Sequence, residues 1–486
     1  MDDNKVVNNF MKATKWSALT EVLTKVISPI TNMILARIIS PEAFGVVATI
    51  TMVTSFAEMI SDAGFQKYLV QHEFSCDKEK YFCSNVAFWT NMFISIIIWL
   101  IILTFNKYIA CLIGNPDLGH VLVIASTQIF FTAVTSIQIA LFRRNFDFRS
   151  IFKIRIITVL LPLVITLPLA LHGFSFWALI IGNLCTGLVN ASMLTYISSW
   201  KPSFYFNFFY LKKMFSFSFW TLIEALSIWL TTWIDIFIVS SFMNSYYLGL
   251  YKTSTSMVNQ IMSLVTTSII PVLFTVLSRL QNDENAFNKV FLKTQKLVSI
   301  IIFPLGIGIY VYSDLATRII LGANWQEAKS IIGLWALISS IVIILSHFNS
   351  ELYRARGLPK LSFLSQLLHL AFLVPTCIYF SKIGFWIFIY ARSLIRLQSI
   401  LVDFLILKYI VKFNVVKTYT NLFPTFFSAV MMGIVSVFIK SMNSSTAWAI
   451  LSIFISFFIY LMLLLLFSSI RSEVKDLLKN KITKSN

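Results

Sequence analysis

Long apolar stretches, separated by short polar segments, run along the whole chain. A helix needs about 20 mostly apolar residues to cross a bilayer core of about 30 Å. By this measure the sequence predicts an all-α polytopic membrane protein with about fourteen transmembrane helices, whose short connections leave no room for a soluble catalytic domain. The predicted spans are 16–38, 44–66, 84–105, 119–141, 154–171, 174–198, 215–241, 248–277, 294–313, 329–352, 361–381, 384–407, 421–440 and 446–468.

The composition agrees with this prediction. Hydrophobic residues make up 57% of the 486 positions and charged residues only 12%, whereas soluble domains carry about 25% charged residues. With the N-terminus placed in the cytoplasm, the predicted inside segments hold 29 of the 39 Lys and Arg, and the outside loops hold 6. By the positive-inside rule both termini are then cytoplasmic. The net charge of +18 is explained in this way without nucleic acid.

A short pattern recurs 204 residues later in the chain. Trp16 is followed 29 residues on by Gly45 at the start of the next span, and Trp220 is followed in the same way by Gly249. Because transporters are often built from duplicated bundles, we expect two parallel six-helix repeats followed by two further helices. The predicted parts are an N-terminal lobe 1–213, a C-terminal lobe 214–412, a helix pair 413–470 and a basic cytoplasmic tail 471–486.

Polar residues fall on single faces of several predicted spans, at helical spacing. Because charges inside a membrane are costly, they usually face a bundle interior or a water-filled cavity. The polar candidates for the cavity lining are Glu21, Ser28, Asn32, Ser256, Asn259 and Ser263. The cationic candidates for substrate binding are Lys25, Lys252, Arg392 and Arg396. The carboxylate candidates for coupling to Na⁺ or protons are Glu58, Asp62, Glu224 and Asp235.

A plainer explanation of these stripes stays open, in which their members pair with one another or with neighbouring helices. Glu21 and Lys25 stand one turn apart, and Asp403 is available to the two arginines. The stripes recur in the first two spans of both predicted repeats, which favours a hydrated cavity. Arg392 and Arg396, one turn apart near mid-membrane, form a fork suited to a phosphate or a carboxylate.

No catalytic or cofactor motif is present in the sequence, which lacks a P-loop, a metalloprotease motif and a serine-hydrolase motif. The five cysteines follow no metal-binding pattern. We therefore expect a transporter that is not an enzyme and has no cofactor or metal site. The N-terminal segment lacks the apolar core and cleavage site of a signal peptide, so the first helix is expected to direct insertion.

Several segments between residues 12 and 360 carry a family resemblance, in order along the chain. They are ILARIISPEAFGVVA (34–48), LGLYKTS (248–254), PVLFTVLSRLQND (271–283), FPLGIGIY (303–310), LGANWQEA (321–328) and YRARGLP (353–359). Together they resemble the polysaccharide-transporter branch of the multidrug/oligosaccharidyl-lipid/polysaccharide (MOP) flippase superfamily. Within that branch they are most similar to Wzx-type O-antigen or exopolysaccharide repeat-unit flippases. Arg392 and Arg396 lie beyond the segment that carries the resemblance.

This resemblance implies a two-lobed, MATE-like bundle that works by alternating access. It implies a flippase that moves undecaprenyl-diphosphate-linked oligosaccharides from the inner to the outer leaflet of the bacterial plasma membrane. Lysines and arginines would bind the diphosphate, and a groove beside the last two helices would hold the lipid tail. Membrane lipid, a polysaccharide polymerase and other assembly proteins are further expected partners. The cargo's sugars, the pathway, the coupling ion and the oligomeric state stay open.

Two other functions are compatible with a chain of this kind. A cation-coupled multidrug exporter would share the fold but is expected to have an acidic or neutral cavity, whereas the stripes here contain lysines and arginines. A membrane-integral glycosyltransferase or ligase is expected to carry a large outer domain, which the short outer loops argue against.

Overall fold

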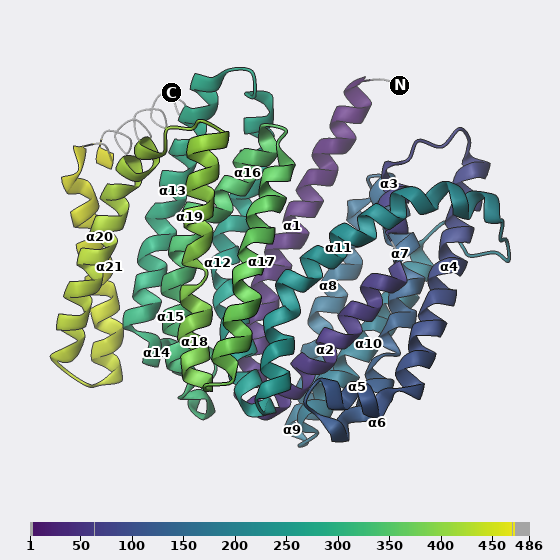
Figure 1. The fold of residues 1–486 in the computed structure, drawn as a ribbon, viewed down its shortest axis with the longest axis horizontal. Coiled ribbons are helices and arrows are strands. Elements are labelled where there is room, and N and C mark those ends of the chain that lie inside the picture. The colour runs from purple at the N-terminus through teal and green to yellow at the C-terminus, as the bar shows by residue number, and fades with distance from the viewer. Residues whose placement is uncertain (1–2, 63, 469, 472–486) are drawn as a thin grey trace. The chain divides into compact units, whose positions relative to one another are not determined.

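The computed structural model describes residues 3–62, 64–468 and 470–471, and every regular element within them is a helix (Figure 1). Thirteen helical segments of this part are long and apolar enough to cross a membrane. The predicted all-α polytopic fold is thereby confirmed. The chain divides into two compact units, Met1–Thr253 (unit 1) and Ser254–Asn486 (unit 2).

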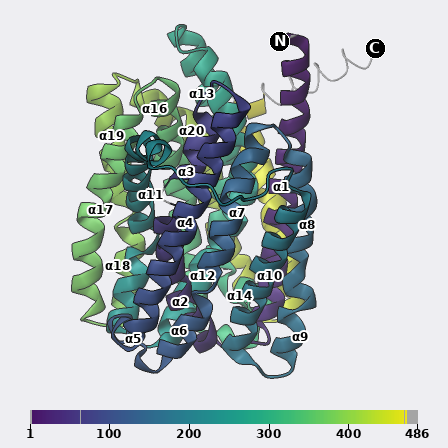
Figure 2. The ribbon, with the colours of Figure 1, turned by 90° about the vertical axis from the view of Figure 1, so that its right-hand side faces the viewer.

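Unit 1 is a bundle in which α7 lies between α4 and α10 (Figure 2). Its core is built from fully buried aliphatic side chains such as Leu122, Ile129 and Ile137. The helices of this unit are α1 (Asp3–Ala36), α2 (Pro41–Asp62), α3 (Phe65–Gln71), α4 (Asp77–Thr104), α5 (Asn106–Leu112), α6 (Gly119–Ala125), α7 (Gln128–Arg144), α8 (Phe148–Val164), α9 (Thr166–Leu171), α10 (Ser175–Ile197), α11 (Phe208–Phe242) and the start of α12 (Ser245–Arg279).

The boundary between the units falls inside α12 because α11 packs on α2, α3 and α4 of unit 1. The lobe limits 1–213 and 214–412 that the repeat suggests stay a prediction. The predicted fifth span, 154–171, is present as α8 and α9, which are separated at Ile165. Pro168 explains this break, because a proline has no N–H to donate and its ring clashes with the carbonyl four residues earlier.

Unit 2 is a second helical bundle, in which α13 packs against α15 and α20, and α20 against α21. Two of its segments, η3 and η4, are π-helical. The elements that follow α12 are α13 (Glu284–Val311), α14 (Ser313–Ile320), α15 (Ala328–Val342), η3 (Ile343–His347), α16 (Phe348–Ala355), α17 (Pro359–Ser381), α18 (Phe385–Leu394), α19 (Leu397–Leu405), η4 (Ile406–Ile410), α20 (Val415–Ser441) and α21 (Thr446–Leu466).

The predicted span 384–407 is present as two shorter helices, α18 and α19, which together cover the expected stretch. Each has fewer residues than a membrane crossing needs, so neither is among the thirteen long segments. The interruption falls at Ile395 and Arg396, beside one of the predicted cationic residues. The count of about fourteen spans therefore agrees with the structure, once the twelfth span is recognised as a broken helix.

The first turns of α2 and α12 touch within unit 1 at two glycines. A Cβ atom on Gly45 would collide with the Ser245 carbonyl oxygen, and one on Gly249 would collide with the Pro41 carbonyl oxygen. Each added Cβ would also lie 2.9 Å from the backbone nitrogen of the other glycine. The contact is reciprocal, and its partners are 204 residues apart. The offset that the sequence repeat shows is thus also present in a contact.

We expect alanine at either glycine of this contact to destabilise the protein. Gly249→Ala should cost about 1–3 kcal/mol of unfolding free energy, because the backbones would have to separate around the new methyl group. Gly308 is a matched control, since it also lies in a helix but has no atom within 4 Å of the place that a methyl group would take. Gly308→Ala should be neutral or slightly stabilising. Equal unfolding midpoints of the two purified variants would contradict this interpretation of the contact.

Candidate functional site

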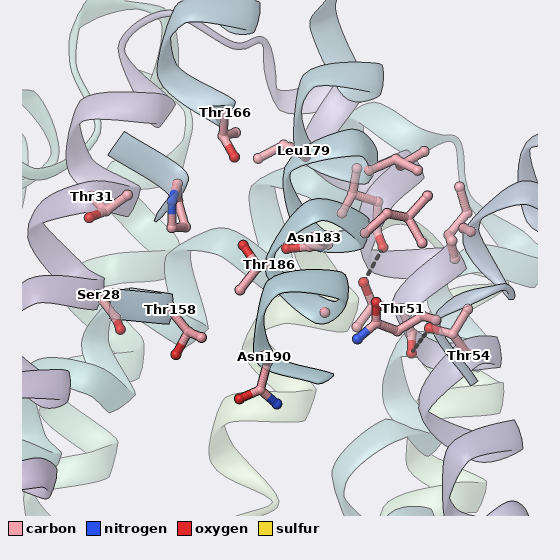
Figure 3. A pocket seen from close by; sticks show the side chains of 18 of the residues that line it. Ser28, Thr31, Thr51, Thr54, Thr158, Thr166, Leu179, Asn183, Thr186 and Asn190 are labelled. Atoms are coloured by element: carbon pink, nitrogen blue, oxygen red, sulfur yellow. Dashed lines mark hydrogen bonds between the residues drawn. The ribbon is translucent and has the colours of Figure 1, made fainter. Parts of the chain in front are cut away.

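A polar pocket of about 520 Å³ lies within unit 1. Small-molecule sites typically have volumes of about 300–1,000 Å³. Figure 3 shows hydroxyl and amide side chains around it, with Ser28, Thr31 and Thr158 across from Thr51 and Thr54. The polar residues that line the pocket, from α1, α2 and α7 to α10, are Ser28, Thr31, Asn32, Thr51, Thr54, Ser55, Glu58, Gln128, Arg155, Thr158, Thr166, Asn183, Thr186 and Asn190.

The hydroxyl groups of this lining present acceptor oxygens to the pocket. Thr51 Oγ1 donates to the Val47 carbonyl oxygen at 2.7 Å, and Thr158 Oγ1 donates in the same way at 3.1 Å to the residue three positions earlier. A hydroxyl group that donates to its own helix keeps its lone pairs for a ligand. The amides of Asn183 and Asn190 can both donate and accept. The pocket therefore matches both halves of the hydrogen bonds that a hydroxylated molecule makes.

Two oxygen atoms of pocket-lining residues are buried without a hydrogen-bond partner in the part of the chain that is described. They are Gln128 Oε1 and Thr186 Oγ1. The neighbouring Gly187 leaves room for the Gln128 amide, because a Cβ at this glycine would lie 2.8 Å from Gln128 Nε2. A buried acceptor left unsatisfied costs about 1–3 kcal/mol. The position therefore favours a hydrogen-bond donor inside the pocket.

The predicted residues of α1 and α2 divide between this pocket and its surroundings. Ser28, Asn32 and Glu58 line it, as the polar stripes suggest, and Glu58 Oε1 accepts a hydrogen bond from Thr132 at 3.0 Å. Asp62, one turn beyond Glu58, does not line it and accepts a hydrogen bond from Ser136.

The two predicted charges nearer the start of α1 are also outside the lining. Glu21 is exposed, and Lys25 is half-buried one turn later. Of the charged residues predicted on α1 and α2, the structure therefore brings only Glu58 to the pocket.

Unit 1 also holds Asp235 and Lys252, at the end of α11 and the start of α12. Asp235 is 5% exposed and accepts a hydrogen bond from the Tyr251 hydroxyl at 2.6 Å. The Lys252 ammonium lies 4.2 Å from the centre of the Trp233 ring, a cation–π distance. The side chain of Glu224, the remaining predicted carboxylate, lies outside the described residues. Asp235 and Lys252 are thus held by aromatic neighbours.

In unit 2, Arg392 and Arg396 share one aromatic partner, the indole ring of Trp335. Their guanidinium carbons lie 5.1 and 4.2 Å from the ring centre, respectively. Arg396 also donates to Ser339 Oγ at 2.8 Å, and Trp335 Nε1 donates to Asn259 Oδ1 at 3.0 Å. The structure therefore brings together both predicted arginines and the predicted Asn259. The sequence does not predict Trp335, because one tryptophan in an apolar span gives no signal.

The remaining predicted residues of α12 have ordinary local environments. Ser256 is half-buried, and Ser263 Oγ donates to the Gln260 carbonyl oxygen at 2.7 Å. The alternative pairing of the arginines with Asp403 is not what the structure shows for this carboxylate. Asp403 accepts its hydrogen bonds from hydroxyl groups of Ser346, Tyr353 and Ser365.

A third feature is an apolar cavity of about 650 Å³ in unit 2, lined by α13, α14, α20 and α21. Ile301, Leu305 and Ile309 line it from α13, and Phe457 and Leu461 line it from α21. Its few polar atoms pair among themselves, since Ser436 Oγ donates to Ser456 Oγ at 2.7 Å. A cavity of this kind accommodates hydrocarbon.

The sequence of residues 34–330 matches the family described as "Polysaccharide biosynthesis protein". The chain is 27% identical over 335 residues to the succinoglycan biosynthesis transport protein ExoT of Rhizobium meliloti (strain 1021), covering 68% of this chain and 67% of that protein. It is 22% identical to the teichuronic acid biosynthesis protein TuaB of Bacillus subtilis (strain 168), covering 89% of each.

Among solved structures the fold is similar to that of the lipid II flippase MurJ in an inward closed conformation. The TM-score is 0.72 at 17% sequence identity, over 92% of this chain and 98% of MurJ. At this identity the likeness concerns the fold alone. It confirms the fold that the sequence resemblance implies.

We expect Trp335 to be the residue that orders the arginine cluster. Trp335→Phe keeps a ring beneath the guanidinium groups but removes the hydrogen bond to Asn259, so it should cost about 1 kcal/mol. Trp335→Ala removes both and should cost about 3–5 kcal/mol. Trp386, which is 37% exposed, is a matched control, and its alanine variant should stay within about 0.5 kcal/mol of the wild type. Unfolding of the purified proteins measures all three, and equal losses at Trp335 and Trp386 would contradict the assignment.

Proposed function

Because the chain belongs to the polysaccharide biosynthesis protein family, we propose that it is a flippase for lipid-linked saccharides. Its cargo is an undecaprenyl-diphosphate-linked oligosaccharide repeat unit, and it moves this cargo from the inner to the outer leaflet of the bacterial plasma membrane. Two relatives are named for succinoglycan transport and teichuronic acid biosynthesis, and the fold neighbour is named as a lipid II flippase. All three names concern cell-surface saccharides or their lipid-linked precursors.

The observation that carries this proposal is the polar pocket inside a membrane-spanning bundle. A hydroxyl- and amide-lined pocket is costly to build in an apolar environment unless a polar ligand or water fills it. Sugars offer many hydroxyl groups, each of which is a donor and an acceptor. We assign part of the oligosaccharide to this pocket, where Asn183, Asn190 and Gln128 would hydrogen-bond to it and Glu58 would accept from its hydroxyl groups.

The diphosphate needs cations, and the cluster of Arg392 and Arg396 supplies them. A guanidinium group pairs with phosphate oxygens through two parallel N–H donors. Trp335 holds both groups on one ring, so little side-chain entropy is lost when an anion binds. Lys25 and Lys252 are further cations for the same charge. The apolar cavity beside α20 and α21 is assigned to the polyprenyl tail, since its lining is almost entirely hydrocarbon.

The transport cycle is proposed to be alternating access by two six-helix lobes, driven by an ion gradient. Glu58, Asp62, Glu224 and Asp235 are the proposed coupling groups, because a carboxylate inside a membrane can exchange a cation or a proton. Both termini would face the cytoplasm, and a polymerase would use the cargo after its release.

Charge removal at the two arginines tests the assignment of the diphosphate. In a host that lacks its own copy of the gene, Arg392→Gln with Arg396→Gln should lower the amount of surface polysaccharide at least about tenfold, because charge-assisted bonds to the diphosphate are lost. Arg318, an exposed arginine of the same unit, is the control, and Arg318→Gln should complement fully.

A normal level of polysaccharide in the double variant would remove the arginines from the proposal. If purified protein instead exported organic cations and bound no lipid-linked saccharide, the alternative of a multidrug exporter would replace the flippase.

Neutral replacements test the proposed ion coupling. Asp235→Asn and Asp62→Asn should each impair complementation severalfold, since an amide cannot take up a cation or a proton. Asp283→Asn is the control, because Asp283 caps α13 by accepting from the Ala286 N–H and asparagine caps equally well. If all three variants complement equally, these two carboxylates have no coupling role.

A further inference from the structure

Asp403 is the carboxylate of α19 that accepts hydrogen bonds from three hydroxyl groups. Ser346 Oγ donates to Oδ2 at 2.5 Å, and Ser365 Oγ and the Tyr353 hydroxyl donate to Oδ1 at 2.9 and 3.2 Å. The donors come from η3, α17 and α16, so the carboxylate connects three segments of unit 2. Asp403 is 1% exposed, and Tyr353 is fully buried.

This carboxylate has no counter-charge among the described residues. Its side-chain partners are all neutral hydroxyl groups. The titratable and charged residues on the segments around it, besides Tyr353, are His347 on η3, Glu351 and Arg354 on α16, Lys360 and His369 on α17, Arg396 before α19 and Lys408 on η4. Glu351 and Arg354 pair with each other at 3.1 Å, and none of this group forms an ion pair with Asp403.

An isolated ionised carboxylate in so buried a place costs several kcal/mol, which hydrogen bonds from three neutral hydroxyl groups offset only in part. A bound proton removes this cost. The oxygen–oxygen distances of 2.5 to 3.2 Å around Asp403 are those of hydrogen bonds, so a proton fits the cluster without any displacement of its side chains. The same spacing leaves no room for a metal cation between the oxygens.

The backbone around Asp403 is unusual as well. Ser346 lies in the π-helical segment η3, and the second π-helical segment, η4, begins three residues after Asp403. A π turn leaves its carbonyl groups less regularly bonded, and Gln295 Nε2 donates to one of them, Ile344 O, at 2.8 Å. Such turns are rare and occur often at functional sites.

Asp403 also lies within reach of one membrane face. Ser365 stands six residues after the start of α17, which is about 9 Å at 1.5 Å per residue. This is the end of unit 2 that the charge count assigns to the cytoplasm. A proton can therefore reach the carboxylate over two helical turns.

We propose that Asp403, with Ser346, Ser365 and Tyr353, is a proton-binding site of unit 2, and that its protonation couples the transport cycle to the proton gradient. The coupling role rests on the proposed function, whereas proton binding does not. Uptake places the proton on a carboxylate oxygen and makes the group neutral. Release returns the negative charge, which the three hydroxyl groups then stabilise. The contact between α16, α17 and α19 would thus differ between the two states.

Infrared difference spectroscopy of the purified full-length protein tests the binding step. Between about pH 4 and pH 9, a range that includes the shifted values of buried carboxyl groups, the wild type should lose a protonated-carboxyl C=O band. Asp403→Asn should lack this band. Asp314→Asn should keep it, because Asp314 is half-exposed and pairs with Lys440 at 2.6 Å.

If Asp403→Asn does not fold, Ser365→Ala carries the test. It removes one donor to Oδ1, so the band should shift in frequency. A band that is unchanged in either variant overturns the proposal. So does a band that responds to replacing sodium by choline at fixed pH, which would mean that the site takes Na⁺.

Export in the complementation host tests the coupling step. Asp403→Asn should lower the amount of surface polysaccharide at least about tenfold and should remove its dependence on external pH. Normal export with a normal pH dependence would overturn the coupling role. If the wild type moves no lipid-linked saccharide at all, the flippase assignment fails, while the infrared result stands by itself.

Discussion

A polar group carried into the hydrocarbon of a bilayer has to find its partner inside the protein, because no water is available there. This constraint is behind each of the features that distinguish this chain from an inert bundle. Hydroxyl groups around the pocket of unit 1 donate to their own helices, the guanidinium groups of Arg392 and Arg396 lie against an indole ring, and Asp403 collects three hydroxyl donors. Each arrangement keeps a reactive polar group in place at a tolerable cost.

These arrangements also divide the chemistry of the proposed cargo. The pocket of unit 1 offers neutral hydrogen-bonding groups, the arginine cluster of unit 2 offers positive charge, and the cavity beside α20 and α21 offers hydrocarbon. A lipid-linked saccharide has one part suited to each. A small organic cation would need only one of the three, and it would be repelled by the arginines. The combination therefore favours an amphiphilic anion as the transported molecule.

The sequence predicts the fold well because hydrophobic length and the distribution of Lys and Arg act over whole helices. It also predicts Ser28, Asn32 and Glu58 at the pocket, since these residues belong to stripes with a helical period. It misses Gln128, Arg155 and Asn183, which have no stripe around them, and it misses Trp335, whose role depends on side chains of two other helices. Glu21 and Asp62 follow the same period but stay outside the pocket, because a stripe fixes a direction and not a depth.

The contact between Gly45 and Gly249 has a consequence for how this chain can evolve. Each glycine is confined by the backbone of the segment that corresponds to it 204 residues away, so neither position can acquire a side chain while the other segment keeps its course. Duplicated halves normally drift apart independently. Here a substitution in one copy is penalised by the other copy, and the two ancestral segments are expected to retain their smallest residue together across related genes.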